Sequence, residues 1–169
     1  MLIATLGSCV KGDKGDTGAT GAAGTNGTNG NANVVAGFVT LNSSNYTWDN
    51  TAKLYYSDVT DASITSDIVS TGVVLCFLQA SGQSAWTAMP SSIALSSTES
   101  IYFTFSYYLN TVELDLQFSD QSTASSIGTT NFKIVCISSA QRQAHPHTNW
   151  NNYNEVQAAL GSSMIEHTL

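Results

Sequence analysis

Two pairs of side chains have the types and spacing that metal sites use. His145-Pro146-His147 places two imidazoles two residues apart, and Asp58 and Asp61 place two carboxylates three residues apart. Structural zinc sites use four protein ligands, and calcium loops use dense alternating oxygens around a turn glycine. Neither pair has such neighbours in the sequence, so we interpret both as solvated loop residues and expect no metal site.

The sequence contains no pattern typical of a catalytic site. A serine elbow, a Cys/His pair, paired carboxylates in a glycine-rich frame and a phosphate-binding loop each need a defined context, and none occurs. We therefore expect neither enzyme activity nor a cofactor. Aromatic rings remain, because their faces can stack on sugars. The candidates are Trp48, Trp86, Tyr55, Tyr56, Tyr102 and Tyr108.

Cys76 and Cys136 lie in the two most apolar segments, residues 73–78 and 132–138. In an oxidising compartment these residues could form a disulfide if their strands are adjacent and their side chains face each other. The alternative is a pair of buried thiols that pack as small hydrophobic groups. The sequence favours the buried thiols.

Cys9, unlike Cys76 and Cys136, lies at the end of a short apolar stretch at the N-terminus. Leu6-Gly7-Ser8-Cys9 resembles the lipobox of bacterial lipoprotein precursors, in which the cysteine thiol receives a diacylglycerol. A secretory signal also has a basic n-region and a longer apolar h-region, so we expect a truncated precursor or a start codon placed too late. Residues 1–9 are interpreted as a signal remnant with lipidated Cys9; the alternative is a frayed N-terminus with an incidental cysteine.

Glycine recurs at every third position between residues 10 and 33. The periodic residues are Gly12, Gly15, Gly18, Gly21, Gly24, Gly27 and Gly30. This spacing is typical of a collagen triple helix, because only glycine fits at the axis of three polyproline-II chains. Such a tract would span about 60 Å. It contains no proline to preset the backbone, so it would need a trimeric head to hold three chains in register. The alternative is a flexible spacer.

Residues 34–169 have the pattern of one all-β domain. Residues 101–109 and 112–118 alternate between apolar and polar side chains, which predicts a hairpin with one solvated face. Segments 73–78 and 132–138 have apolar residues at both odd and even positions, which predicts central strands buried on both faces. Weaker strand patterns occur at residues 35–41, 53–57 and 85–89. The pattern predicts an antiparallel β-sandwich, either jelly-roll-like or immunoglobulin-like.

Two short helices are predicted within this domain. One covers residues 64–72, with Thr65 or Ser66 as N-cap and Gly72 as the stop. The other covers about residues 152–160 and closes the domain, because Asn152 and Glu155 are spaced as in a capping box.

Composition excludes two classes of partner. The formal net charge is −7, and charged residues make up only 10% of the chain. Binding of nucleic acid or of an anionic membrane surface needs clustered Lys and Arg, which the sequence lacks. No apolar run is long enough to span a bilayer. We expect membrane attachment through the N-terminal lipid alone.

Four features occur together in this chain: the lipobox, the tract ending Gly27-Thr28-Asn29-Gly30-Asn31-Ala32-Asn33-Val34, the segment Ile64-Thr65-Ser66-Asp67-Ile68-Val69 with Val73-Val74-Leu75, and Tyr153-Asn154-Glu155-Val156-Gln157-Ala158-Ala159-Leu160. This combination resembles the uncharacterised collagen-like lipoproteins of Bacteroidota. It implies an envelope lipoprotein with a C-terminal β-sandwich. We expect this lipoprotein to be anchored in the outer membrane and exposed at the cell surface. We expect a homotrimeric head that makes adhesive or structural contacts with a glycan or surface protein. The alternative is a glycan-binding module that uses exposed Trp and Tyr on one sheet face.

Overall fold

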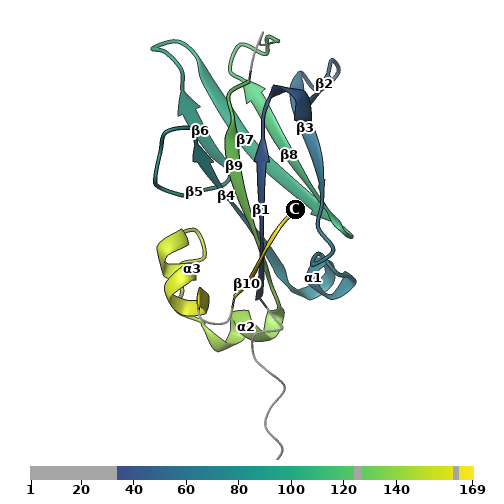
Figure 1. Cartoon of the computed structure of the whole chain (residues 1–169), viewed down its shortest axis with the longest axis vertical. Coiled ribbons are helices and arrows are strands. Elements are labelled where there is room, and N and C mark those ends of the chain that lie inside the picture. The colour runs from purple at the N-terminus through teal and green to yellow at the C-terminus, as the bar shows by residue number, and fades with distance from the viewer. Residues whose placement is uncertain (1–33, 124–126, 162–163) are drawn as a thin grey trace, which may run out of the picture.

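Strands that alternate in polarity and strands that are apolar on both faces belong to two different sheets. The computed structural model describes residues 34–123, 127–161 and 164–169, which form a sandwich of two five-stranded sheets (Figure 1). In strand order, sheet A consists of β10 (Ile165–Thr168), β1 (Val34–Leu41), β9 (Thr130–Ile137), β4 (Val73–Ala80) and β5 (Thr87–Ala88). Sheet B consists of β2 (Thr47–Asp49), β3 (Leu54–Thr60), β8 (Thr111–Phe118), β7 (Ser100–Tyr108) and β6 (Ser91–Ala94).

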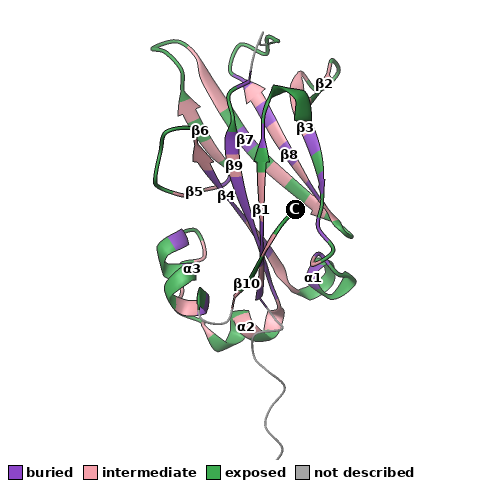
Figure 2. Cartoon of the chain, viewed as in Figure 1, coloured by how far each residue is buried: buried purple, intermediate pink, exposed green. Residues whose placement is uncertain are grey.

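The predicted all-β sandwich is confirmed. β7 and β8 form the expected antiparallel hairpin, with Phe103 paired to Leu116 and Phe105 paired to Leu114. Burial alternates at every residue along β8, so one face of sheet B packs on the core and the other faces solvent (Figure 2). Every strand pair is antiparallel except β1 with β10, which is parallel.

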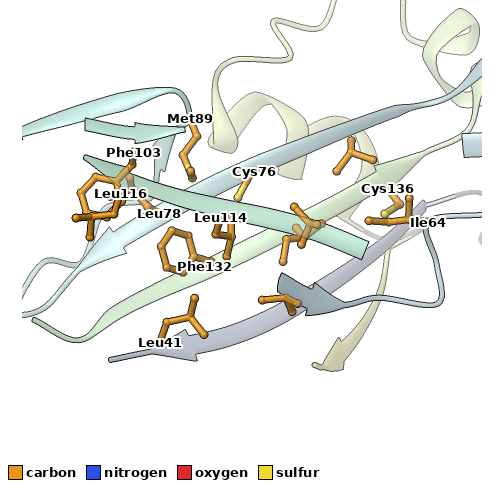
Figure 3. Packing of buried hydrophobic residues seen from close by; sticks show 14 of the residues in the cluster. Leu41, Ile64, Cys76, Leu78, Met89, Phe103, Leu114, Leu116, Phe132 and Cys136 are labelled. Carbon is orange, nitrogen blue, oxygen red and sulfur yellow. The ribbon is translucent and has the colours of Figure 1, made fainter. Parts of the chain in front are cut away.

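Sheet A is covered on both faces, which explains why β4 and β9 have apolar residues at both odd and even positions. The inner face of sheet A meets sheet B in the main core, to which Cys76, Phe132, Ile134 and Cys136 belong (Figure 3). The outer face packs against α3 (Tyr153–Leu160) in a second core. This second core contains Val34, Ala36, Phe77, Val135, Ile137, Tyr153, Val156 and Leu160.

The helices begin at capping side chains, as predicted. Thr65 Oγ1 accepts a hydrogen bond from Ile68 N at the start of α1 (Ser66–Thr71). Gly72 ends α1. A Cβ atom at this position would lie only 2.8 Å from the Ile137 carbonyl oxygen, so a larger residue would displace the backbone. Asn152 Oδ1 accepts hydrogen bonds from the amides of Asn154 and Glu155 at the start of α3.

Several elements lie outside the sequence-based expectation. α2 (Ser139–Ala144) follows β9, and η2 (Ser43–Asn45) is a single 3-10 turn after β1. The helix α3 does not close the domain, because the chain returns as β10 along the edge of β1. The backbone amide of Leu169 extends this pairing by donating to Phe38 O at 2.8 Å.

The two ends of the sandwich differ. β1 begins at the end where α1 and α2 lie, while the β2–β3 and β6–β7 loops lie at the opposite end (Figure 1). The outermost strands of both sheets are short: four residues in β10, two in β5, three in β2 and four in β6. The longer strands are all interior.

Candidate functional site

The predicted lipid and stalk residues lie outside the described part of the chain. This applies to Cys9 and to Gly12, Gly15, Gly18, Gly21, Gly24, Gly27 and Gly30. The remaining candidates are all described, and the structure separates them into buried and exposed groups.

Cys76 and Cys136 are free, buried thiols on adjacent strands. In the β4–β9 ladder, Cys76 pairs with Ile134 and Val74 pairs with Cys136. The two cysteines are therefore diagonal neighbours, and such positions are about 7–8 Å apart, too far for a disulfide without backbone movement. Burial raises the pKa of Cys136 to about 12, and burial also raises the pKa of Cys76.

These thiols should resist alkylation in the folded chain. In a Cys9→Ser variant, we expect negligible labelling by iodoacetamide at about pH 8, because the reactive thiolate is scarce and enclosed. Both thiols should react fully once the chain is unfolded in guanidinium chloride. Labelling can be counted by intact-mass spectrometry. Rapid modification of either cysteine under native conditions would contradict the assignment of both as core residues.

The two candidate aspartates do not face each other. Asp58 lies on the exposed face of sheet B, where its carboxylate accepts a hydrogen bond from the Tyr108 hydroxyl at 3.0 Å. Asp61 is buried, and its Oδ1 accepts hydrogen bonds from the backbone amide and the hydroxyl of Ser63. His167 Nε2 of β10 lies 3.6 Å from Asp61 Oδ1, a contact between β10 and the segment after β3 that no sequence spacing indicated.

His145 and His147 line a shallow depression in the loop after α2. Glu155 of α3 lines the same depression, but one of its carboxylate oxygens accepts from the Asn149 amide at 3.2 Å. Within residues 34–123, 127–161 and 164–169, no group of three or more His, Cys, Asp or Glu side chains could hold a metal ion.

The candidate aromatics are divided between core and surface. Trp48 and Tyr55 pack on each other with ring centroids 4.9 Å apart. Tyr102 and Tyr108 are exposed, at 47% and 48%, but they lie near opposite ends of β7. They therefore do not form a continuous stacking surface. Trp86 lies just before β5 of the other sheet and lines a cavity.

The exposed face of sheet B is acidic. Glu113 and Asp115 of β8 lie on this face with Asp58, which is paired to Glu113. Desolvation and the charges of Asp115 and Asp58 raise the pKa of Glu113, while desolvation and Asp58 raise the pKa of Asp115. Asp115 Oδ2 accepts from the Thr104 hydroxyl, but its buried Oδ1 has no hydrogen-bond partner among the described residues.

Neutralising this face should stabilise the fold at neutral pH. A carboxyl pKa raised by folding means that the native state binds the proton more tightly than the unfolded state, so the charged form costs stability above that pKa. We expect Asp115→Asn to raise Tm by about 2 °C at neutral pH. The gain should shrink as the pH falls through the native pKa of Asp115. An equal gain at acidic and neutral pH, measured by thermal unfolding, would contradict this cause.

A cavity of about 520 Å³ lies where β10 ends beside β1; we call it the sheet A cavity. Its lining includes Phe38 and Thr40 of β1, Asn131 of β9, Trp86 before β5, and Thr168 and Leu169 at the end of β10. The rings of Phe38 and Trp86 meet edge to face, with centroids 6.2 Å apart. The sheet A cavity thus combines an aromatic wall with hydroxyl and amide groups.

Lys133 lies beneath this aromatic wall and is 4% exposed. Its Nζ lies 4.5 Å from the ring centroid of Phe38, 4.7 Å from that of Trp86 and 4.0 Å from that of Tyr153. Nζ also donates a hydrogen bond to the Tyr153 hydroxyl. No carboxylate of the described residues forms an ion pair with Lys133. Cation–π attraction and this hydrogen bond therefore stabilise the buried ammonium.

The chain matches no protein-family model, no curated protein and no solved structure. No helix in the described ranges is long and apolar enough to cross a membrane.

Proposed function

We propose that the chain is a cell-envelope lipoprotein that carries a non-catalytic β-sandwich head on a collagen-like stalk. The observation that carries this proposal is the unbroken glycine period from Gly12 to Gly30, which ends just before β1. Lipidated Cys9 would anchor the stalk at the outer membrane. The head would then make adhesive or structural contacts at the cell surface.

The position of β1 supports this arrangement. The chain enters the sandwich at the end that carries α1 and α2, whereas the β2–β3 and β6–β7 loops lie at the far end (Figure 1). A stalk that entered there would leave these loops and the exposed face of sheet B available for contacts. Three heads on one stalk would raise avidity without requiring a tighter single site.

The oligomeric state tests this proposal. We would compare by light scattering a full-length Cys9→Ser variant with a chain that begins at Asn31. A trimer in both would mean that the head nucleates the stalk, and a trimer only in the longer chain would mean that the tract itself associates. Either result supports the proposal. A monomer in both would overturn the triple-helical stalk and leave residues 10–33 as a tether.

A matched pair of variants distinguishes a triple helix from other association. Gly21→Val places a side chain at the crowded axis, whereas Ala22→Val leaves the glycine period intact. In the trimer we expect only Gly21→Val to lower the melting temperature of the polyproline-II signal in circular dichroism. Equal effects of the two variants would contradict a triple helix.

Glycan binding is a second candidate function, and the sheet A cavity favours it. Sugar-binding surfaces combine aromatic rings, which pack against C–H groups, with polar side chains that bond to hydroxyls. The sheet A cavity brings together Phe38, Trp86, Thr40 and Asn131 in this way. The exposed tyrosines of sheet B are too far apart along β7 to offer the same combination.

A further inference from the structure

We propose that the sheet A cavity binds an uncharged pyranose unit of a glycan. This inference rests on glycan binding, the second candidate function, and it assigns the residues and the ligand class. The cavity volume of about 520 Å³ falls in the range of about 300–1,000 Å³ typical of small-molecule sites.

The aromatic wall supplies the apolar part of the site. The ring of Trp86 meets Phe38 edge to face with centroids 6.2 Å apart, and it is tilted against Tyr153 with centroids 6.0 Å apart. Trp86 and Phe38 are each partly exposed rather than fully buried. A pyranose ring presents a face of C–H groups that can pack on such rings. Burial of this face would contribute the hydrophobic part of the binding free energy.

A row of polar side chains supplies the hydrogen bonds. The Thr40 hydroxyl donates to Asn131 Oδ1 at 2.8 Å, Asn131 Nδ2 donates to Gln79 Oε1 at 3.2 Å, and Gln79 Nε2 donates to Ser84 O at 3.1 Å. These bonds fix the orientation of the Asn131 amide. Its second amide proton and the lone pairs of the Thr40 oxygen can still bond to a ligand. A donor beside an acceptor suits sugar hydroxyls, which can both donate and accept.

Lys133 positions the wall and does not provide a charged contact. Its ammonium touches the faces of Phe38, Trp86 and Tyr153 from below, which holds three rings from distant parts of the chain together. The side chain does not line the sheet A cavity. Among the residues that the structure describes, no Lys or Arg lines this cavity, and the chain carries a net charge of −7. These features favour an uncharged ligand over a polyanion.

The test follows the indole N–H signals of the three tryptophans by NMR in the full-length Cys9→Ser chain. The probes are uncharged oligosaccharides of glucose, galactose, mannose and N-acetylglucosamine. Polygalacturonate is the charged comparison, and each probe is added to a concentration of up to about 10 mM. We expect at least one uncharged probe to shift the Trp86 signal and to leave the Trp48 signal unchanged.

Matched variants locate the site. We would measure the affinity of each variant by isothermal titration calorimetry, because Trp86→Ala removes the indole reporter. Asn131→Ala and Trp86→Ala should weaken binding about tenfold or more, whereas Tyr102→Ala removes an exposed ring from the other sheet and should not. Thermal unfolding of each variant checks the fold, and Asn131→Ala decides if Trp86→Ala does not fold. Lys133→Met should weaken binding and broaden the Trp86 signal, because the wall loses the ammonium that holds it.

Three other outcomes would each overturn the inference: a different binding surface, a charged ligand, or no glycan binding. Binding that is lost in Tyr102→Ala but kept in Asn131→Ala would retain glycan binding and move it to sheet B. Binding of polygalacturonate alone would exclude an uncharged ligand. No shift with any probe would remove glycan binding altogether, while the stalk proposal would still stand on its own mass measurement.

Discussion

Replacing Phe132 with alanine should lower the free energy of unfolding by about 3–5 kcal/mol. Phe132 lies on the inner face of β9 and is 1% exposed. Its ring centroid is 6.3 Å from that of Phe103 in sheet B, so it contacts both layers of the main core (Figure 3). Truncation would leave a cavity between two sheets that cannot collapse without disturbing both ladders. Urea unfolding, followed by circular dichroism, measures the loss.

The control for this prediction is Leu95→Ala. Leu95 is also a large apolar residue, but it is 50% exposed in the β6–β7 loop. Its truncation should change the free energy of unfolding by less than about 0.5 kcal/mol. Similar losses in both variants would mean that the interface between the sheets is not the main source of stability.

The second large effect concerns the attachment of α3 to sheet A. We expect Tyr153→Ala to cost about 3–4 kcal/mol. Tyr153 is only 9% exposed, and its ring centroid lies 5.1 Å from that of Phe77. The substitution would also remove the hydroxyl and the ring that stabilise the Lys133 ammonium. Hydrogen exchange should show the amides of α3 losing protection more than those of β8.

Tyr153→Phe separates the contributions of the ring and the hydroxyl. This variant keeps the packing on Phe77 and the ring over Lys133, and it removes only the acceptor. We expect a loss of about 1.5–3 kcal/mol, the range for a hydrogen bond to a charged group. A neutral effect would mean that the three rings alone stabilise the ammonium, and the hydrogen bond to Tyr153 would then carry little energy.

Local pattern was sufficient for the central strands. The alternation of apolar and polar residues along β7 and β8 predicted their hairpin. In β4 and β9, apolar residues stand at both odd and even positions, which predicted strands buried on both faces. Side-chain caps at Thr65 and Asn152 predicted where α1 and α3 begin. These signals are encoded within a few consecutive residues, so they can be read without knowledge of the tertiary structure.

The peripheral strands and the candidate site depend on distant contacts. β10 is a four-residue strand that exists because it pairs with the edge of β1, and nothing in its own sequence requires it. Phe38, Trp86 and Tyr153 come from distant parts of the chain, and the pairing of β1 with β9 and the packing of α3 place them around Lys133. One signal was available: Lys133 is a single cation within a segment otherwise expected to be buried on both faces.

The short outermost strands affect how neighbouring heads can meet at high density. A long, straight sheet edge is a template on which another chain can add a strand, and this leads to aggregation. Here the outer strands contain two to four residues, so a foreign strand would gain few backbone hydrogen bonds by pairing with any one of them. Crowded copies of the domain would therefore pair only weakly through these edge strands, and contacts between them would depend on side chains at their faces and loops.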